Sequence, residues 1–572
     1  MALPPLSPAI VGMVPYSVPR HPAPLDLLLD GIGGLSSPPD LFNRLADADP
    51  ELLVRGYPDA RALAARLATD LGVAADRVLV TAGGDDALDR ACRAFLAPGR
   101  SLVLPVPTFE MIPRYARWTG ATVREVPWPG GEWPLQAVLN AVDASTTLVA
   151  VVSPNNPTGQ VISAEMLRAL SAALPNVLLL VDLAYVEFAD EDLTSVVEQL
   201  ENAVAFRTMS KAWGLAGLRV GYAMGSAAAI AALRVAGNPY PVSGPSLHLA
   251  GKRLDHDGDA SRAYVTAVRG QRDELTSVLC KLGVDAQRSQ ANFVFARSPR
   301  ADWLRDGMAG LGIGVRAWPG HPNLADAVRI NIPSDAATTA RLHAAMHSVL
   351  APEALLFDAD GVLVDVSASY REAIRLTAAA FGVDITRADI TAAKALGNAN
   401  NDWVLTRSLL AAKGVDVPLT EVTACFEGLY QGTDTVAGLK LTERARFSRA
   451  DLERLRGRLP LAVVTGRPRR DAMELLEREG WTDLFDAVVV MGETAPKPDP
   501  APVHAALQRL GVRAAWMIGD TVDDVRAARA AGVVPLGMVA PGEDASRAGP
   551  ALLAAGAARI IKSSFDLECL LP

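Results

Sequence analysis

The chain has 572 residues, of which 50% are apolar and 21% charged, and its formal net charge is −9. That length exceeds one hydrophobic core, so two or more domains are expected. The negative charge argues against a general nucleic-acid or anionic-membrane surface, and no apolar run approaches the roughly 18–20 residues of a membrane span. The Pro-broken N-terminus is a poor signal peptide, and the cysteines show no metal-binding spacing, which favours a cytoplasmic enzyme with reduced thiols.

Strand and helix patterns alternate from about Asp59 onward. RVLVTAGG precedes DDALDRACRAFL, and TTLVAVVSP precedes SAEMLRALSAAL. This alternation predicts an α/β fold with a parallel sheet covered by helices on both faces. A predicted helix over HAAMHSVLAPEA stops at Pro352, and the strand pattern restarts with ALLFDADGVL. We therefore expect one domain over residues 1–350 and another over 353–572, the second with a helical insertion over about 367–448.

One group of residues fits an aldehyde cofactor that carries a phosphate. Such a cofactor needs a lysine amine for a Schiff base, a carboxylate that keeps its pyridine nitrogen protonated, and donors for its phosphate. Asp182 ends the apolar strand PNVLLLVD, and Ser210, Lys211 and Arg219 follow within one short stretch. Gly83-Gly84-Asp85 begins a helix after a strand, so its backbone N–H groups can face an anion. The sequence predicts a cofactor pocket around Lys211.

The segments around these residues resemble the fold-type I pyridoxal-phosphate aminotransferases, most closely the histidinol-phosphate aminotransferase group. The matching segments, over residues 54–333, are YPDARAL, TAGGDDAL, PTFEMIPRYARWTGA, SPNNPTG, VDLAYVEF, TMSKAWGLAGLRVGY, GIGVRAWPG and VRINIP. The resemblance implies a large parallel-sheet domain over about 40–240 and a small α/β domain over about 245–350 that includes the N-terminal segment. It also implies pyridoxal 5′-phosphate as cofactor and a homodimer.

The same resemblance implies a role for each matching residue. Lys211 would form the Schiff base and move the substrate α-proton, and Asp182 would pair with the pyridine nitrogen. The other cofactor contacts would come from Asn156 and Tyr185 at the ring hydroxyl, Phe109 stacked on the ring, and Gly84, Asp85, Ser210, Arg219 and the neighbouring subunit's Tyr57 at the phosphate. Arg329 would bind a substrate carboxylate, and Arg316 a second anion. Packing roles stay open for Phe109 and Tyr57.

Two segments depart from that family pattern on the substrate side. An Asn-Glu-Asn-Pro run is usual near the N-terminus, whereas this chain has LLLDGIGGLSSPP, which contains Asp30 and several glycines. RINIPSD also lacks the Gly-Thr that normally follows the arginine. Pyridoxal chemistry is therefore expected, while the identity of the amine stays open.

A second group of polar residues lies at three further predicted strand ends. They are Asp358 and Asp360 after ALLF, Thr465 in LAVVT, and Asp520, Asp523 and Asp524 after AAWMIG. The carboxyl ends of parallel strands meet at one edge of a sheet, where such folds bind ligands. Converging carboxylates repel one another unless a divalent cation or a lysine such as Lys497 lies among them. The pattern predicts a magnesium-dependent phosphomonoester hydrolase site.

DADGVLVD, VVTGRP, APKPDP and IGDTVDD, over about residues 355–537, resemble the phosphatase branch of the haloacid-dehalogenase superfamily with a helical cap. The resemblance implies that Asp358 is the nucleophile and Asp360 the general acid and then base. It assigns the phosphoryl group to Thr465 and Lys497, and Mg²⁺ to Asp358, the backbone carbonyl of Asp360, Asp520 and, close by, Asp524. Asp523 fits a helix N-terminal role equally well.

The predicted helical insertion carries VSASYREAI and GNANNDW. This combination resembles a subgroup of the superfamily that is sometimes joined to histidine-pathway enzymes. Its candidate substrate-facing residues are Arg371, Lys394, Asn401 and Trp403. Packing or solvated roles are equally open for all four.

A fused pair of enzymes favours consecutive steps of one pathway. The simplest hypothesis is amination of imidazole-acetol phosphate by glutamate to histidinol phosphate, followed by hydrolysis to histidinol. One alternative is an aminotransferase for an aromatic, phosphorylated or phosphono amino acid in secondary metabolism, with a phosphatase of different substrate. Another is that one half is an inactive scaffold, against which both complete motif sets argue.

Overall fold

The structure, a computed structural model, describes residues 5–31, 33–396 and 401–572. Its contacts divide the chain into two units. The first unit comprises residues up to Val18, Leu29–Ser298 and Trp318–Thr339. The second comprises Pro19–Leu28, Pro299–Ala317 and Ala340–Pro572. Three segments of the predicted first domain, residues 19–28, 299–317 and 340–350, thus belong to the second unit. The domain boundary at 350–353 stays a prediction.

The first unit is organised around a seven-stranded sheet. In spatial order its strands are β2 (Val78–Thr81), β8 (Gly221–Gly225), β7 (Ala203–Thr208), β6 (Leu178–Asp182), β5 (Thr146–Val152), β3 (Ser101–Val106) and β4 (Thr122–Pro127). β8 runs antiparallel to both of its neighbours, and the other neighbouring pairs are parallel. The expected parallel sheet is therefore a mixed sheet with one reversed strand.

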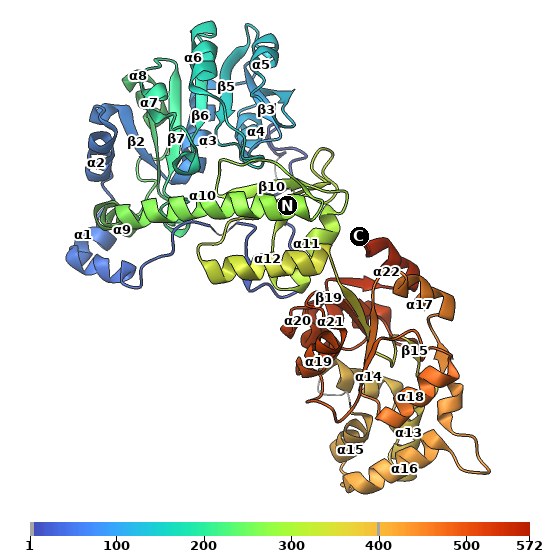
Figure 1. The fold of residues 1–572 in the computed structure, drawn as a ribbon. Helices are drawn as coiled ribbons and strands as arrows, with labels where there is room; N and C mark the ends of the chain where they lie inside the picture. Colours follow the sequence, from blue (N-terminus) through green and yellow to red (C-terminus); the bar gives the residue numbers. More distant parts are fainter. Residues whose placement is uncertain (1–4, 32, 397–400) are drawn as a thin grey trace. The chain divides into compact units, whose positions relative to one another are not determined.

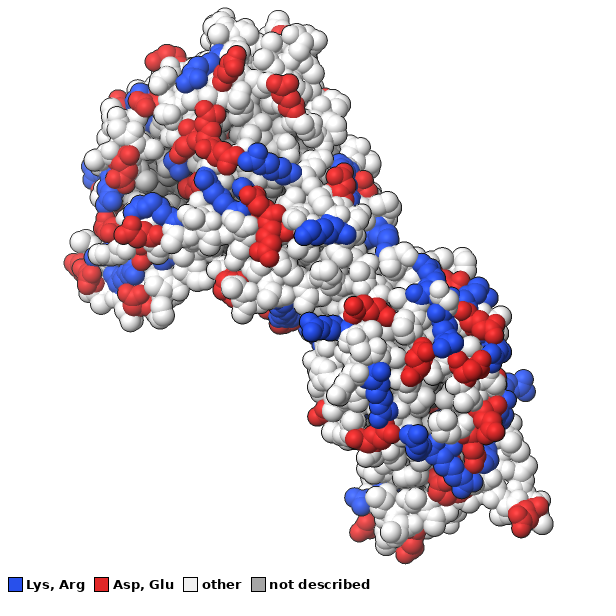
Figure 2. Space-filling view, in the orientation of Figure 1, with Lys and Arg blue, Asp and Glu red and all other residues white. Residues whose placement is uncertain are grey.

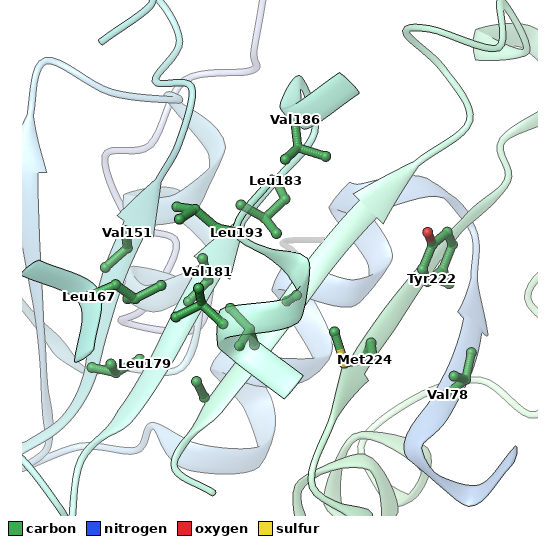
Figure 3. Close-up of a cluster of buried hydrophobic side chains, with 14 of the residues drawn as sticks. Val78, Val151, Leu167, Leu179, Val181, Leu183, Val186, Leu193, Tyr222 and Met224 are labelled. Atoms are coloured by element: carbon green, nitrogen blue, oxygen red, sulfur yellow. The ribbon is translucent and has the colours of Figure 1, made fainter. Parts of the chain in front are cut away.

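Helices cover both faces of this sheet because successive strand side chains point to opposite sides. In β5, Val149 and Val151 join the core beneath one set of helices, whereas Leu148 and Ala150 join the core beneath the other. The first set is α2 (Arg61–Leu71), α5 (Leu135–Ala141), α6 (Ala164–Ala173), α7 (Thr194–Glu198) and α9 (Gly244–His256); the second is α3 (Gly83–Phe95), α4 (Met111–Trp118) and α8 (Ala227–Val235). Figure 3 shows Val151 and Leu167 together in the first core.

A smaller antiparallel sheet completes the first unit. β10 (Phe293–Arg297) pairs with β13 (Ala327–Asn331) and β9 (Asp285–Ala286). The long helix α10 (Gly258–Lys281) precedes these strands and is prominent in Figure 1, and the short α1 (Pro50–Arg55) lies near the start of the unit. Helix α12 (Ala336–Leu350) ends two residues before Pro352, which confirms the predicted stop.

The second unit contains a six-stranded sheet in which every neighbouring pair is parallel. Its order is β18 (Ala487–Val489), β17 (Leu461–Val464), β14 (Ala354–Phe357), β19 (Ala515–Gly519), β20 (Val534–Met538) and β21 (Arg559–Ile561). The first strand in sequence, β14, is central, and all of its residues are buried. The surrounding helices are α17 (Arg449–Arg456), α18 (Arg469–Arg478), α19 (Ala501–Leu510), α20 (Val522–Ala530), α21 (Ala545–Ala555) and α22 (Ser564–Leu570).

A helical insertion lies between β14 and β17, within the predicted limits of 367–448. It contains α13 (Tyr370–Ala380), α14 (Arg387–Leu396), α15 (Asp402–Ala412) and α16 (Leu419–Gln431). The two-residue strands β15 (Val364–Asp365) and β16 (Arg444–Ala445) pair antiparallel beside the two chain crossings. Two predicted features lie partly outside the described residues: residues 397–400 of the GNANNDW motif, and Ile32 of the N-terminal segment LLLDGIGGLSSPP that differs from the family pattern.

Within the second unit, segments from the predicted first domain pack against the six-stranded sheet. The Trp303 ring of α11 (Ala301–Gly310) lies edge-on to that of Trp516, with centroids 4.6 Å apart. Trp303 Nε1 donates to Val349 O at 3.1 Å, and Trp516 Nε1 donates to Ser348 O at 2.7 Å. The remaining short strands of this unit are β1 (Leu27–Leu28), parallel to β11 (Ile313–Gly314), and β12 (Arg316–Ala317).

Surface charge is mixed in sign. On the face shown in Figure 2, lysine and arginine side chains alternate with aspartate and glutamate without an extended region of one sign. In the described part of the chain, no helix combines the length and apolarity needed to cross a membrane.

Candidate active sites

The first site is built at the carboxyl end of β6, where Asp182 is the last strand residue. Its carboxylate is buried, and Oδ1 accepts a hydrogen bond from Ala184 N at 3.0 Å. Burial raises the pKa of Asp182 to about 6, the negative charge of Asp85 adds to the rise, and Lys211 opposes it. The positive charge of Lys211 does not fully offset the effect of burial on the Asp182 carboxylate. Such a carboxylate favours a further cationic partner.

Lys211 follows β7 and faces an aromatic ring. Its Nζ lies 5.2 Å from the centroid of the Tyr185 ring. The Tyr185 ring is itself buried and meets Phe293 edge-on, with centroids 5.2 Å apart. Neighbouring parallel strands β6 and β7 thus bring the predicted lysine, carboxylate and tyrosine to one edge of the sheet. Phe293, in the segment ANFVF, was not anticipated from the sequence.

The predicted phosphate donors gather at the start of α3. Arg219 adopts a left-handed backbone with φ 54°, and its Nη2 donates to Asp85 Oδ2 at 3.0 Å. Gly83 has φ 76°, a left-handed backbone that favours glycine, and the Arg219 guanidinium lies against it, 2.8 Å from where a Cβ would stand. Gly84 lies in the first helical turn, where backbone N–H groups lack helical acceptors. Ser210 Oγ accepts from Thr208 Oγ1 at 2.9 Å.

Arg329 joins the site to the divergent N-terminal segment. Its Nη1 donates to Asn156 Oδ1 at 2.6 Å, and its Nη2 donates to the backbone oxygen of Asp30 at 2.8 Å. The guanidinium carbon lies 5.0 Å from the centroid of the Phe293 ring. The predicted substrate arginine and the predicted ring-hydroxyl asparagine are therefore neighbours.

Three further predicted residues are Tyr57, Phe109 and Arg316. Tyr57 is 83% exposed and stacks on Tyr240 with centroids 4.8 Å apart. Phe109 is partly buried and packs against the core beneath α3 and α4. Arg316 is buried in β12 and belongs to the second unit. Their proposed functional roles stay predictions.

These residues fit pyridoxal phosphate. The under-compensated Asp182 carboxylate suits a protonated pyridine nitrogen, and the start of α3 with Arg219 suits a phosphate. The Arg219 and Asp85 side chains are 50% and 42% exposed, so the Arg219 guanidinium is accessible to a phosphate.

The second site lies at the carboxyl ends of β17, β14 and β19, three neighbouring strands. Lys497 Nζ lies 2.6 Å from Asp358 Oδ1 and 2.5 Å from Asp524 Oδ1, and it donates to Val464 O at 3.0 Å. Burial raises the pKa of Asp358 well above its ordinary value, and Lys497 opposes the rise. Thr465 is buried at the end of β17, where its backbone N–H bonds Val489 O at 3.0 Å.

Three of the predicted metal ligands converge. One oxygen each from Asp358, Asp520 and Asp524 lies within 4.8 Å of the others. Burial, followed by the charge of Asp524, raises the pKa of Asp520 to about 7. Asp524 is fixed by a capping box in which Thr521 Oγ1 donates to its Oδ2 at 2.6 Å. Oxygen donors under mutual repulsion suit a hard divalent cation such as Mg²⁺.

Gly361 is required by this arrangement. Its φ is 78°, and a Cβ there would collide with the Asp520 carboxylate. Asp523 is buried in the first turn of α20, which fits the helix N-terminal role considered for it.

Asp360 is held by an arginine that sequence reasoning missed. Arg467 Nε donates to Asp360 Oδ1 at 2.7 Å, and its Nη2 lies 2.5 Å from the same oxygen. Burial raises the pKa of Asp360, and Arg467 limits that rise. Arg467 also binds Glu443, whose pKa burial alone would raise but which Arg467 and Arg478 hold below its ordinary value. The motif VVTGRP contained Arg467, but nothing local indicated its partners.

The four insertion residues have defined partners. Arg371 forms an ion pair with Glu543, and Lys394 Nζ lies 3.1 Å from Asp402 Oδ1. The positive charges of Arg371 and Lys394 both act to lower the pKa of Asp520. The two side chains therefore lie close enough to the acidic cluster to affect it electrostatically. The side chain of Asn401 caps α15, and Trp403 Nε1 donates to Glu427 Oε1 at 3.1 Å.

Comparison with known families assigns a family to each half of the chain. The family model for class I and II aminotransferases matches residues 49–346, and that for haloacid dehalogenase-like hydrolases matches residues 352–532. The chain belongs to the class I and II aminotransferases and is of the histidinol-phosphate aminotransferase-like kind, fused to a haloacid dehalogenase-like hydrolase domain.

The chain is also similar to individual proteins of known name. A histidinol-phosphate aminotransferase of Halalkalibacterium halodurans is 32% identical over 371 residues, which cover 61% of this chain and 98% of that protein. An imidazoleglycerol-phosphate dehydratase of Phytophthora nicotianae is 46% identical over 197 residues, 33% of this chain and 44% of that protein, so the chain spans less than half of it. A solved histidinol-phosphate aminotransferase from Sinorhizobium meliloti shares the fold, with a TM-score of 0.55, 24% identity and coverage of 61% and 98%.

Proposed function

We propose that the chain aminates imidazole-acetol phosphate with glutamate and then hydrolyses the resulting histidinol phosphate to histidinol. The observation that carries the proposal is the presence of two catalytic groups in one chain. These are Lys211 beside the buried Asp182 and Tyr185, and Lys497 among Asp358 and Asp524. The name of the Halalkalibacterium relative, which the chain covers almost completely, supports histidinol phosphate as the amine.

In the aminotransferase half, pyridoxal phosphate when bound supplies an aldehyde carbon and an electron-accepting ring. Lys211 Nζ holds and moves the proton of the substrate α-carbon. Asp182 keeps a proton on the ring nitrogen, and Arg329 orients a substrate carboxylate or phosphate by paired hydrogen bonds. Arg219, Ser210 and the start of α3 hold the cofactor phosphate.

In the hydrolase half, Mg²⁺ when bound offsets the negative charge of the acidic cluster and the phosphoryl group. Asp358 attacks phosphorus, so that an aspartyl–phosphate bond forms as the ester P–O bond breaks. Asp360 gives its proton to the leaving alcohol and then takes one from the water that hydrolyses the aspartyl phosphate. Lys497 and Thr465 hold the phosphoryl oxygens. Inorganic phosphate and free Asp358 complete the turnover.

The proposed homodimer is supported by an exposed apolar surface. Tyr57, Leu52 and Val54 on and after α1 are 83%, 71% and 77% exposed, and Tyr240 stacks on Tyr57. Exposed large apolar side chains near one another in the chain are available for burial against a partner subunit. In a dimer, Tyr57 would reach the cofactor phosphate of the partner.

A second candidate is an aminotransferase for an aromatic, phosphorylated or phosphono amino acid. The contact of Arg329 with the Asp30 backbone favours it, because the divergent segment then shapes the substrate side of the pocket directly.

A coupled assay tests the proposal. Purified protein with pyridoxal phosphate, Mg²⁺, glutamate and imidazole-acetol phosphate is expected to release inorganic phosphate only after amination of the ketone. Histidinol phosphate supplied alone should release phosphate without glutamate. Absence of amination excludes the first half of the proposal, and stability of histidinol phosphate excludes the second.

Two variants separate the halves and test the scaffold alternative. Lys211→Ala should abolish amination and leave hydrolysis of histidinol phosphate unchanged, whereas Asp358→Asn should do the reverse. If neither substitution alters any turnover, one or both halves are not the enzymes proposed.

A further inference from the structure

The structure places a buried ionic network between the catalytic acid Asp360 and the helical insertion. Arg467 is its centre: the side chain is 1% exposed and bonds Asp360, Glu443 and the Tyr430 hydroxyl, the last at 3.1 Å. Its guanidinium carbon also lies 5.0 Å from the centroid of the Tyr370 ring. A planar guanidinium with partners on several edges has one orientation.

Glu443 forms the other half of the network. Its side chain is fully buried, at 0% exposure. Oε1 accepts from Arg467 Nη2 at 2.9 Å, Tyr430 OH at 3.0 Å and Ser369 Oγ at 3.1 Å. Oε2 accepts from Arg467 Nη1 at 3.2 Å and Arg478 Nη2 at 2.8 Å. All five bonds end on one carboxylate, so its loss leaves several buried donors unmatched.

The network joins the two points at which the chain enters and leaves the insertion. Ser369 directly precedes α13 and Glu443 directly precedes β16, so they lie at the two crossings between the sheet domain and the insertion. Arg467 and Arg478 belong to the sheet domain, before and within α18. Glu443 therefore ties both crossings to the arginine that holds Asp360.

We infer that Glu443, acting through Arg467, is a positioning residue that sets the orientation of the Asp360 carboxylate and links it to the placement of the insertion. Asp360 and Glu443 occupy adjacent edges of the Arg467 guanidinium. Loss of the Glu443 charge frees one edge, so the guanidinium can turn and carry the Asp360 carboxylate with it. A general acid displaced by about 1 Å loses much of its effect. This inference rests on the proposed role of Asp360.

Leaving-group dependence distinguishes positioning of the acid from a merely structural role. With full-length enzyme in excess and Mg²⁺ present, first-turnover release of the alcohol is measured for histidinol phosphate, an alkyl phosphate, and for p-nitrophenyl phosphate. The alkoxide needs a proton from Asp360, whereas p-nitrophenolate leaves without one. Glu443→Gln should slow the alkyl phosphate about tenfold or more and p-nitrophenol release less than about twofold.

Asp306→Asn is the matched control. Asp306 is also a buried carboxylate paired with two arginines, Arg305 at 2.7 Å and Arg559 at 2.5 Å, but it has no contact with the network. Asp306→Asn should leave unchanged the ratio of the rates measured with the alkyl phosphate and with p-nitrophenyl phosphate. If Glu443→Gln does not fold, Tyr430→Phe removes one hydroxyl from the same network and should change the ratio in the same direction.

An unchanged ratio in folded Glu443→Gln or Tyr430→Phe overturns the inference while the phosphatase proposal stands. If the wild-type protein hydrolyses neither ester, the proposed phosphatase role fails and this inference fails with it. A ratio changed equally by Asp306→Asn assigns the effect to general destabilisation and also overturns the inference.

Discussion

Asp182 shows how a single buried carboxylate links cofactor binding to stability. Its pKa is about 6 in the folded chain against an ordinary value of 3.8, chiefly because of burial. Between these two values the folded state binds more protons than the unfolded state. The cofactor-free protein should therefore lose stability as pH rises from about 4 to about 6, by on the order of 3 kcal/mol.

Asp182→Asn tests this at the residue scale. The variant cannot ionise, so its cofactor-free form should lack that part of the pH dependence and be more stable than wild type at pH 8. Denaturant unfolding of both proteins, stripped of pyridoxal phosphate, measures the difference. Equal slopes of stability against pH in the two proteins would contradict the assignment.

At the scale of elements, the turn after β14 depends on one glycine. Gly361→Ala should cost about 1–2 kcal/mol through its left-handed backbone and should also abolish phosphatase activity, because the new Cβ meets the Asp520 carboxylate. Gly382 provides a matched control, since its φ is 76° and a Cβ there meets nothing within 4 Å.

Thermal unfolding and phosphate release are measured on both variants. Gly382→Ala should lose similar stability and retain activity. Retained phosphatase activity in Gly361→Ala would show that this close approach is not needed for catalysis.

Much of this element-scale arrangement could be predicted from the sequence. Strand ends at Asp182, Thr465 and Asp520 were recognisable because a run of apolar residues followed by a polar one is a local pattern. The reversal of β8 was not predicted, because strand direction depends on where the chain returns to the sheet. Arg467 was visible in its motif, but its partner Glu443 lies 24 residues earlier in the chain and in none of the motifs.

At the scale of the molecule, the second unit includes part of the aminotransferase sequence. Trp303 lies within the matched aminotransferase region and packs on Trp516 of the hydrolase sheet. Trp303→Ala should remove about 3–5 kcal/mol and lower the temperature at which phosphatase activity is lost. Trp118→Ala, at a ring that is 44% exposed, should not. Equal phosphatase inactivation temperatures for wild type and Trp303→Ala would show that the hydrolase does not depend on this contact.

The proposed dimer predicts complementation between two inactive variants. Tyr57→Ala should weaken cofactor binding in the partner subunit, and Lys211→Ala removes the amine of its own subunit. In a mixed dimer, one site keeps both Lys211 and the partner's Tyr57, so transamination should return on mixing and exchange of subunits. Size-exclusion chromatography with light scattering checks the dimer. A monomer, or no recovery in verified mixed dimers, would exclude a shared site.

The sequence by itself determined the two chemistries, because their reactive residues stand in short motifs at strand ends, where local spacing decides which side chains meet. The tertiary structure alone decided the contacts among distant segments: Arg329 with the Asp30 backbone, Glu443 with Arg467, and residues 299–317 packed with the hydrolase part. Those contacts depend on how the whole chain closes, which no local pattern encodes.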